Sequence, residues 1–256
     1  MTRGLAPDMR AGFTCSKPQS WNEGYHYIVE SKYGYNKASG KIILPWGVAF
    51  THTAINLEGK RVQNEVPYIM FGIYTTTHGV DAGVFYDSGP SRESTGTAGY
   101  YIFLQGGPDV GFLAGSVRVP TGYPLSLVVI EQNNAVDITV FQRTTTEFKQ
   151  VAHENWTIPT TYRFTASGGN TRLTRETSFA QHCGGESDSY MLGTTWEEIY
   201  LYNNSGYSLW TPTLTLTQTW KLGNTAVTEA AAADYAKKYN YAAFYNDQED
   251  IDYRPD

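Results

Sequence analysis

The sequence has few charged residues, only two cysteines and no long apolar run. Charged side chains make up 17% of its 256 residues, against about 25% in an average soluble domain. No stretch approaches the ~20 consecutive apolar residues of a membrane-spanning helix, so we expect no membrane span. The 19 Lys and Arg against 25 Asp and Glu give a formal net charge of −6, without a basic cluster. Because a polyanion is bound through Lys and Arg, we expect no nucleic acid partner.

Cys15 and Cys183 are too few for a disulfide framework, and the sequence leaves open one bridge or two free thiols. His182 and Cys183 are adjacent, so on a strand they would point to opposite faces rather than form a catalytic pair. The five histidines show no metal-ligand spacing, and no glycine-rich phosphate loop is present. We therefore expect no cofactor and no metal.

The first residues lack the apolar stretch of a secretory signal, which is roughly 7–15 residues long. Three possibilities follow from this start. The chain stays inside the cell, leaves it by another route, or has been trimmed to a mature form.

The abundant residues are those of β-sheets and turns, with 20 tyrosines, 25 glycines and many Thr, Ser and Asn. Short runs rich in Val, Ile, Tyr and Thr recur between turn residues and predict strands. The predicted strands are residues 25–30, 41–50, 66–74, 80–86, 99–105, 125–131, 135–142, 196–202 and 213–221. Asn133 and Asn134 predict a tight hairpin, and the almost wholly apolar run 125–130 is expected inside the protein. Many short strands without intervening helices favour an all-β antiparallel sandwich.

The end of the chain has a different pattern. Residues 225–245 are rich in alanine, and Tyr235, Tyr239 and Ala242 follow the spacing of one helical face. We predict one C-terminal α-helix here, capped by Asn224 or Thr228, and a solvated acidic tail after it. The predicted organisation is an N-terminal arm (1–24), a β-sandwich domain (25–222), and the helix with its tail (223–256).

Residues 99–129 contain the pattern Tyr100-x-x-Phe103-x-Gln105-x-x-Pro108, followed by a strand, a corner with proline and glycine, and an apolar strand. This order resembles the middle of the eqolisin (glutamic peptidase) family, which has Tyr-x-x-Trp-x-Glu-x-x-Pro. Upstream, residues 71–74 and 80–84 look like the family's Trp-Val-Gly-Ile and Gln-x-Gly segments. Downstream, residues 174–179 take the place of its Ala-Glu-Trp segment, and 196–202 the strand after it. The resemblance covers roughly residues 40–203. It implies a concanavalin-like jelly-roll β-sandwich of two antiparallel sheets, with the site on the concave sheet.

In eqolisins a glutamate activates water and a glutamine amide stabilises the oxyanion. By the resemblance, Glu176 occupies the glutamate position and Asp81 the glutamine position. An ionised aspartate would repel an oxyanion, whereas a protonated one would donate to it, as in carboxyl pairs that share a proton. Arg175, next to Glu176, is expected to pair with that carboxylate and hold it ionised. The candidate catalytic residues are therefore Glu176 and Asp81.

Several aromatic and polar residues are candidates for ligand contact. Phe103 and Gln105 stand where the family has Trp and Glu, and aromatic rings give flat apolar platforms with a polar edge. The candidate binding residues are Phe103, Gln105, Tyr74, Tyr101 and Trp46.

Three functions fit the sequence. The preferred one is a non-catalytic binding or structural protein whose aromatic surface serves self-association, as a homo-oligomer or filament, or contact with a glycan. The alternative is an acid-active endopeptidase of glutamic or aspartic type that uses an Asp81/Glu176 carboxyl dyad on peptides. The third is a carbohydrate-active enzyme with a carboxylate pair. The family resemblance favours an extracellular or cell-surface location.

Overall fold

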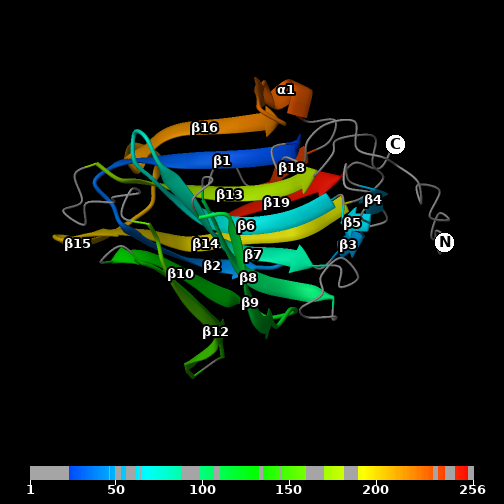
Figure 1. The fold of residues 1–256 in the computed structure, drawn as a ribbon. Coiled ribbons are helices and arrows are strands. Elements are labelled where there is room, and N and C mark those ends of the chain that lie inside the picture. Colours follow the sequence, from blue (N-terminus) through cyan, green and yellow to red (C-terminus); the bar gives the residue numbers. More distant parts are fainter. Residues whose placement is uncertain are drawn as a thin grey trace.

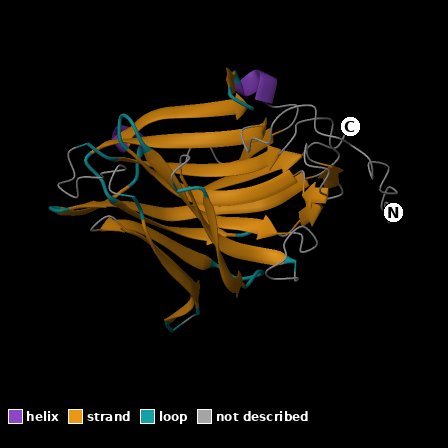
Figure 2. Ribbon diagram, in the orientation of Figure 1, coloured by secondary structure: helices purple, strands orange, loops and turns teal. Residues whose placement is uncertain are grey.

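The computed structural model describes residues 23–45, 47–49, 53–55, 61–63, 65–87, 98–106, 110–132, 135–144, 146–159, 170–181, 190–232, 236–239 and 246–252. These residues form a β-sandwich of two large antiparallel sheets (Figure 1). A two-stranded sheet, β4 (Thr53–Ile55) and β5 (Arg61–Gln63), is added to them. Strands make up most of the described ribbon, and helical structure is confined to short turns (Figure 2). The predicted all-β sandwich is thereby confirmed.

The first sheet has eight strands. Their order is β17 (Thr225–Val227), β16 (Thr215–Leu222), β1 (Glu23–Tyr33), β13 (Arg172–Gln181), β6 (Glu65–Tyr74), β7 (Gly79–Asp87), β8 (Gly99–Gly106) and β9 (Phe112–Val119).

The second sheet has nine strands. Seven follow the order β12 (Phe148–Thr157), β11 (Ala135–Arg143), β10 (Leu125–Gln132), β2 (Lys37–Ile43), β14 (Tyr190–Asn203), β19 (Asn246–Asp252) and β18 (Ala236–Tyr239). Two short strands, β15 (Gly206–Leu209) and β3 (Gly47–Ala49), also pair with β14. A 3₁₀ turn, η2, covers Pro212–Leu214.

The core lies between the two sheets because each strand turns alternate residues inward. In β2, Ala38, Gly40 and Ile42 are buried while Ser39 and Lys41, which alternate with them, are partly exposed. The rings of Phe71 in β6 and Trp196 in β14 join the two layers, with centroids 5.1 Å apart. Burial of such side chains contributes about 25 cal/mol per Å² of apolar surface.

A smaller apolar cluster lies on the other face of the first sheet. It consists of Val66, Met70, Phe85, Tyr101 and Phe103. Strands β6, β7 and β8 therefore have apolar side chains on both faces. This second cluster borders the candidate site described below.

Asn133 and Asn134, where a tight hairpin is predicted, lie outside the described residues. The strands on either side, β10 and β11, pair antiparallel with Gln132 opposite Ala135. The prediction that run 125–130 is wholly internal is wrong. β10 alternates between buried residues such as Leu127 and partly exposed ones such as Val128. One face of this strand packs on the core, and the other faces outward.

The predicted strand 41–50 is wrong in its extent. β2 ends at Ile43 and β3 begins at Gly47, with Pro45 between them. Proline has no backbone N–H to donate, so it interrupts a strand in the interior of a sheet. β9 and β12 are absent from the strands predicted by composition, because their residues are largely exposed. The resemblance to eqolisins alone implied a strand in the region of β9.

The single helix predicted over residues 225–245 is also wrong. The first three residues form β17, and α1 spans only Glu229–Ala232 before β18 begins. Thr228 does cap α1, since its Oγ1 accepts a hydrogen bond from the N–H of Ala231 at 3.2 Å. No helix in the described ranges is long and apolar enough to cross a membrane.

The predicted acidic tail contains β19, which pairs with β14 on one side and β18 on the other. The register sets Lys237 opposite Asp250 and Lys238 opposite Glu249. The prediction of a solvated tail is therefore wrong for residues 246–252, whose strand partner β18 comes earlier in the chain.

Candidate carboxyl site

Asp81 and Glu176 lie on the same face of the first sheet, the one turned away from the main core. Asp81 is in β7 and Glu176 in β13, with β6 between them. In β6, Gly72 lies opposite Asp81 and Met70 opposite Glu176. Residues two apart in a strand share a face, so the two acidic side chains point the same way. Two strand spacings and an offset of two residues along the strand separate their backbones by about 12 Å, and the charge of Glu176 acts on Asp81.

Glu176 is held through one of its two carboxylate oxygens. Oε1 lies 2.9 Å from Nδ1 of His26 and accepts hydrogen bonds from the hydroxyls of Tyr68 at 2.9 Å and Ser178 at 2.5 Å. No described residue donates a hydrogen bond to Oε2. The side chain is only 7% exposed, so its free oxygen faces a sheltered environment.

The three partners of Glu176 come from one row across the sheet. His26 in β1 and Tyr68 in β6 both lie opposite Ser178 in β13. Ser178 is two residues beyond Glu176, so it shares the face of the carboxylate. The register of three neighbouring strands thus places all three donors around Oε1.

These donors lower the pKa of Glu176. Burial by itself would raise this pKa, but the hydrogen bond and charge of His26 and the hydroxyls of Ser178 and Tyr68 outweigh it. Donors favour the ionised form of a carboxyl group, so Glu176 remains a carboxylate in mildly acidic solution. Nε2 of His26 is buried and has no hydrogen-bond partner among the described residues.

Asp81 has the opposite tendency. Burial, and then the negative charge of Glu176, raise the pKa of Asp81 to about 7, although the Tyr74 hydroxyl and His26 act to lower it. The Tyr74 hydroxyl donates to Oδ1 of Asp81. The face therefore carries one carboxyl group that favours the ionised form and one that favours the protonated form.

Two glycines allow the ring of Tyr74 to reach Asp81. Gly79 lies opposite Tyr74 in β7, and Gly72 precedes Tyr74 by two residues on the same face. A Cβ atom at either glycine would overlap the Tyr74 ring. The ring occupies the space that side chains would fill, which brings its hydroxyl to the carboxyl group.

The candidate binding residues lie at different distances from the dyad. Gln105 in β8 lies opposite Asp81 and is partly exposed. Phe103 and Tyr101 follow on the same face but are only 2% exposed, and they belong to the smaller apolar cluster. Phe103 stacks on the more exposed Phe112, with centroids 5.8 Å apart. Trp46 lies outside the described residues.

The prediction that Arg175 pairs with Glu176 is wrong. Adjacent strand residues point to opposite faces, so Arg175 enters the main core. It is 1% exposed, and its Cζ lies 5.9 Å from the ring centroid of Tyr27 and 5.5 Å from that of Trp196. Cation–π contacts of this kind are favourable when the cation is desolvated.

Sequence reasoning missed His26, Tyr68 and Ser178. The spacing of Ser178 from Glu176 was a usable signal, because two strand residues at i and i+2 share a face. His26 is 150 residues from Glu176 in sequence and Tyr68 is 108, so only the strand order reveals them.

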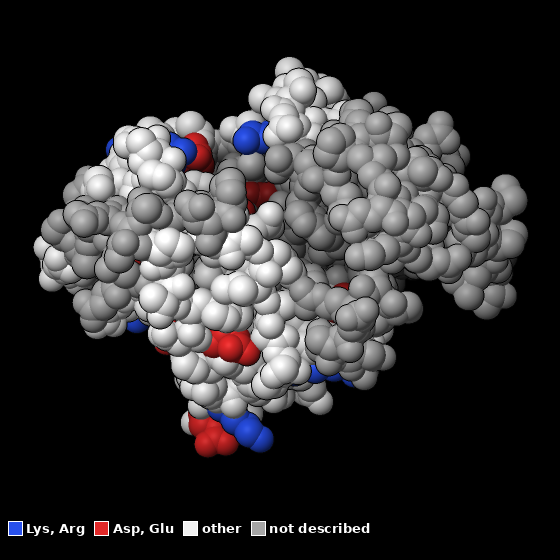
Figure 3. All heavy atoms as spheres, viewed as in Figure 1, with Lys and Arg blue, Asp and Glu red and all other residues white. Residues whose placement is uncertain are grey.

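Within the part of the chain that the structure describes, no group of three His, Cys, Asp or Glu side chains could hold a metal ion. Cys15, Cys183 and His182 lie outside that part. Figure 3 shows that charged side chains are few and scattered over the described surface in that view.

No protein-family model matches the sequence, and no curated protein matches it. Two solved structures show a distant similarity. The carbohydrate binding module CBM66 from Bacillus subtilis has 10% identity and a TM-score of 0.31, covering 63% of this chain and 81% of that one. The alginate lyase from Klebsiella pneumoniae has 12% identity and a TM-score of 0.33, covering 71% of this chain and 61% of the lyase. Both comparisons concern the β-sandwich alone, and they assign no function.

Proposed function

We propose that the protein is an acid-active hydrolase of peptides in which Glu176 is the general base and Asp81 the protonated partner. The observation that carries the proposal is that two acidic side chains share one face of the sheet, in surroundings that push their pKa values apart. The pKa of Glu176 is lowered while that of Asp81 is raised to about 7. Pairs of titratable groups whose pKa values are pushed apart are typical of acid–base catalysis.

Between these two pKa values, Glu176 is ionised and Asp81 carries a proton. Because Tyr74 donates to Oδ1 of Asp81, the proton of Asp81 belongs on Oδ2. Oε2 of Glu176, which receives no hydrogen bond from a described residue, accepts a proton from water as the water oxygen bonds to the scissile carbonyl carbon. Asp81 donates a hydrogen bond to the carbonyl oxygen as that oxygen becomes negative. The proton on Glu176 then passes to the leaving amine as the C–N bond breaks.

The resemblance to eqolisins supports peptides as the substrate class. In that family a glutamine amide donates to the oxyanion, and a protonated Asp81 offers a donor at the equivalent position. Burial, and then the charge of Glu176, raise the pKa of Asp81, which answers the objection that an ionised aspartate would repel the oxyanion. The partly exposed edge of Phe112 beside Phe103 suits an apolar side chain of the substrate. A jelly-roll connectivity of eqolisin type belongs to the same proposal.

Digestion of denatured haemoglobin at about pH 3–4 tests the proposal, since this range keeps Asp81 protonated. We expect cleavage by the unaltered protein and none by Glu176→Gln, which keeps the shape of the side chain but not its basicity. Glu147→Gln is the matched control, because Glu147 is exposed and far from the site in the β11–β12 turn. Absence of cleavage by the unaltered protein, or its persistence in Glu176→Gln, would show that the proposal is wrong.

A second candidate function is non-catalytic self-association. β9 is the last strand in the order of the first sheet, and Phe112, Leu113 and Val117 of this strand are 37%, 37% and 47% exposed. Apolar side chains on an edge strand favour pairing with another chain. Light scattering over a range of concentrations tests this alternative, which requires a mass above that of the monomer.

A further inference from the structure

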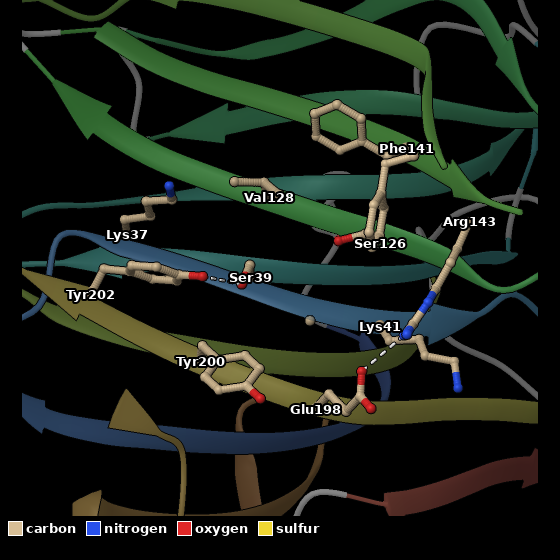
Figure 4. A pocket seen from close by; sticks show the side chains of 12 residues that line it. Lys37, Ser39, Lys41, Ser126, Val128, Phe141, Arg143, Glu198, Tyr200 and Tyr202 are labelled. Carbon is tan, nitrogen blue, oxygen red and sulfur yellow. Dashed lines mark hydrogen bonds and ion pairs between the residues drawn. The ribbon is translucent and has the colours of Figure 1, made fainter. Parts of the chain in front are cut away.

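A groove of about 330 Å³ crosses the outer face of the second sheet, remote from the carboxyl site on the first sheet (Figure 4). Strands β2, β10, β11 and β14 form its floor. Its walls combine basic, acidic and aromatic side chains, all in described parts of the chain. The residues used below are Lys37, Lys41, Arg143, Glu198, Tyr200 and Tyr202.

A β-bulge in β14 shapes this groove. Glu197 lies opposite Lys41 and Tyr200 opposite Ser39, so two residues of β14 face only Gly40 of β2. Glu198, at the bulge, has φ 50°, the one non-glycine residue with positive φ among those described. A left-handed backbone at such a residue is costly and is concentrated at functional sites. The bulge lets Ile199 enter the core while Glu198 lines the groove.

Three tyrosine rings cluster along one side of the groove. Tyr200 and Tyr202 project outward from β14 (Figure 4). Tyr207 of β15, which is 71% exposed, joins them. Its ring lies edge-to-face with that of Tyr200, at 77° with centroids 5.8 Å apart, and tilted by 38° from that of Tyr202, with centroids 5.6 Å apart, so the exposed Tyr207 ring offers a face to a ligand. Tyrosine faces of this kind bind the flat apolar faces of sugar rings, and their hydroxyls bind polar groups at the edge.

The charges of the groove favour an anionic ligand, although the whole chain has a net charge of −6. Lys41 pairs with Glu197, and Nη1 of Arg143 donates to Oε2 of Glu198 at 3.0 Å. Lys37 has no carboxylate partner among the described residues, and its Nζ lies 4.5 Å from the ring centroid of Tyr202. Lys37 and Arg143 stand at opposite ends of the group (Figure 4).

We infer that this groove binds an acidic oligosaccharide, a chain of sugar rings that carry carboxylates. Three features of the ligand follow from the groove. The tyrosine rings favour contact with a flat ring, and Lys37 favours a negatively charged group. The carboxylate of Glu198 only accepts hydrogen bonds, so it favours hydroxyl donors on the same ligand. A sugar acid combines these features. A polyphosphate has neither a flat ring nor hydroxyl donors.

An acidic peptide fits the groove less well. Peptides commonly bind by adding a strand to a free sheet edge. Here β2 is paired on both sides, by β10 and β14, so the floor of the groove offers no free edge. The sugar therefore remains the occupant that the chemistry favours.

Isothermal titration of the full chain with tetragalacturonate tests the inference. Its fully methyl-esterified form is the neutral control, and tetraglutamate is the control for charge without rings. We expect the ester to bind about fivefold more weakly, the usual range for one partly exposed charge pair. We expect no measurable binding of tetraglutamate. Equal affinity for the acid and its ester, binding of tetraglutamate as strong as that of the sugar, or no binding of any probe overturns the inference.

Three variants locate the binding. Lys37→Met should abolish the preference for the acid over the ester, whereas Lys32→Met, on an exposed position of the first sheet, should leave it unchanged. Tyr202→Ala should weaken both sugars about tenfold, as expected for loss of a central aromatic contact. Unaltered binding in both Lys37→Met and Tyr202→Ala would place the ligand elsewhere and overturn the inference. Peptide cleavage should be unaffected in all three, so the test does not depend on the carboxyl dyad.

Discussion

Arg175 and Glu176 are consecutive residues of β13, yet their charges lie on opposite faces of the first sheet. The guanidinium packs between the rings of Tyr27 and Trp196, while the carboxylate receives hydrogen bonds from His26, Tyr68 and Ser178. The ionisation of Glu176 therefore depends on neutral hydroxyls and one histidine rather than on the neighbouring arginine. This arrangement makes the carboxylate sensitive to single substitutions on its own face.

Ser178→Ala should raise the pKa of Glu176, because the Ser178 hydroxyl lowers it. The acidic limb of the activity profile should move to higher pH. The free energy of unfolding at pH 7 should fall by about 1.5–3 kcal/mol, the usual worth of a hydrogen bond to a charged group. A depressed carboxyl pKa stabilises the fold above the unfolded pKa and ceases to do so as pH falls through the folded pKa.

The stability difference between Ser178→Ala and the unaltered protein should therefore shrink in strongly acidic urea titrations. Ser116→Ala, at an exposed position of β9, is the matched control. An unchanged acidic limb in Ser178→Ala would mean that this hydroxyl does not tune Glu176.

Asp81→Asn should increase thermal stability more at pH 7 than at pH 4. The pKa of Asp81 is raised to about 7 in the folded protein, while an aspartate in the unfolded chain has a pKa of about 3.9. Between these values the folded state holds a proton that the unfolded state has lost, so the unaltered protein loses stability as pH rises through this window. Asparagine does not titrate, and the difference in Tm between the two proteins should grow from pH 4 to pH 7. A constant difference across this window would contradict the raised pKa.

Glu198→Gly should stabilise the protein by about 1 kcal/mol, because a left-handed backbone costs an L-residue roughly 1–2 kcal/mol. The lost pair with Arg143 is exposed and offsets at most about 1 kcal/mol. Glu198→Ala is the matched control, since it removes the same carboxylate but keeps the strained backbone. Urea unfolding should rank the glycine variant above the alanine variant. The reverse order would show that the bulge is not strained at this residue.

The positions of many strands could be predicted from the sequence because alternation and β-branched residues mark them locally. The bulge is also visible in the spacing of apolar residues in β14. The buried residues of this segment are Trp196, Ile199 and Leu201, and a spacing of three followed by two is a one-residue slip in a period of two.

The candidate carboxyl site was only partly predictable. The family resemblance drew attention to Asp81 and Glu176, but their protonation depends on His26, Tyr68 and Tyr74. His26 meets Glu176 only because β1 and β13 pair in one particular register. Local sequence patterns specify which residues of a strand share a face, and they do not specify which strand lies beside it.

The helix prediction for the carboxyl-terminal segment was wrong for the same reason. Alanines and an i, i+4, i+7 aromatic pattern favour a helix locally, yet β18 and β19 complete the second sheet. Backbone pairing in the second sheet outweighs weak local propensity, because propensity differences amount to less than about 1 kcal/mol per residue.

β19 is an interior member of its sheet, with β14 on one side and β18 on the other. Its backbone groups are therefore bound along both edges. A protein shortened before Asn246 would uncover the N–H and C=O groups of β14 that now pair with β19, between Tyr190 and Glu197. Such an uncovered edge recruits strands from other molecules. Expression of a chain truncated before Asn246 should accordingly yield aggregates.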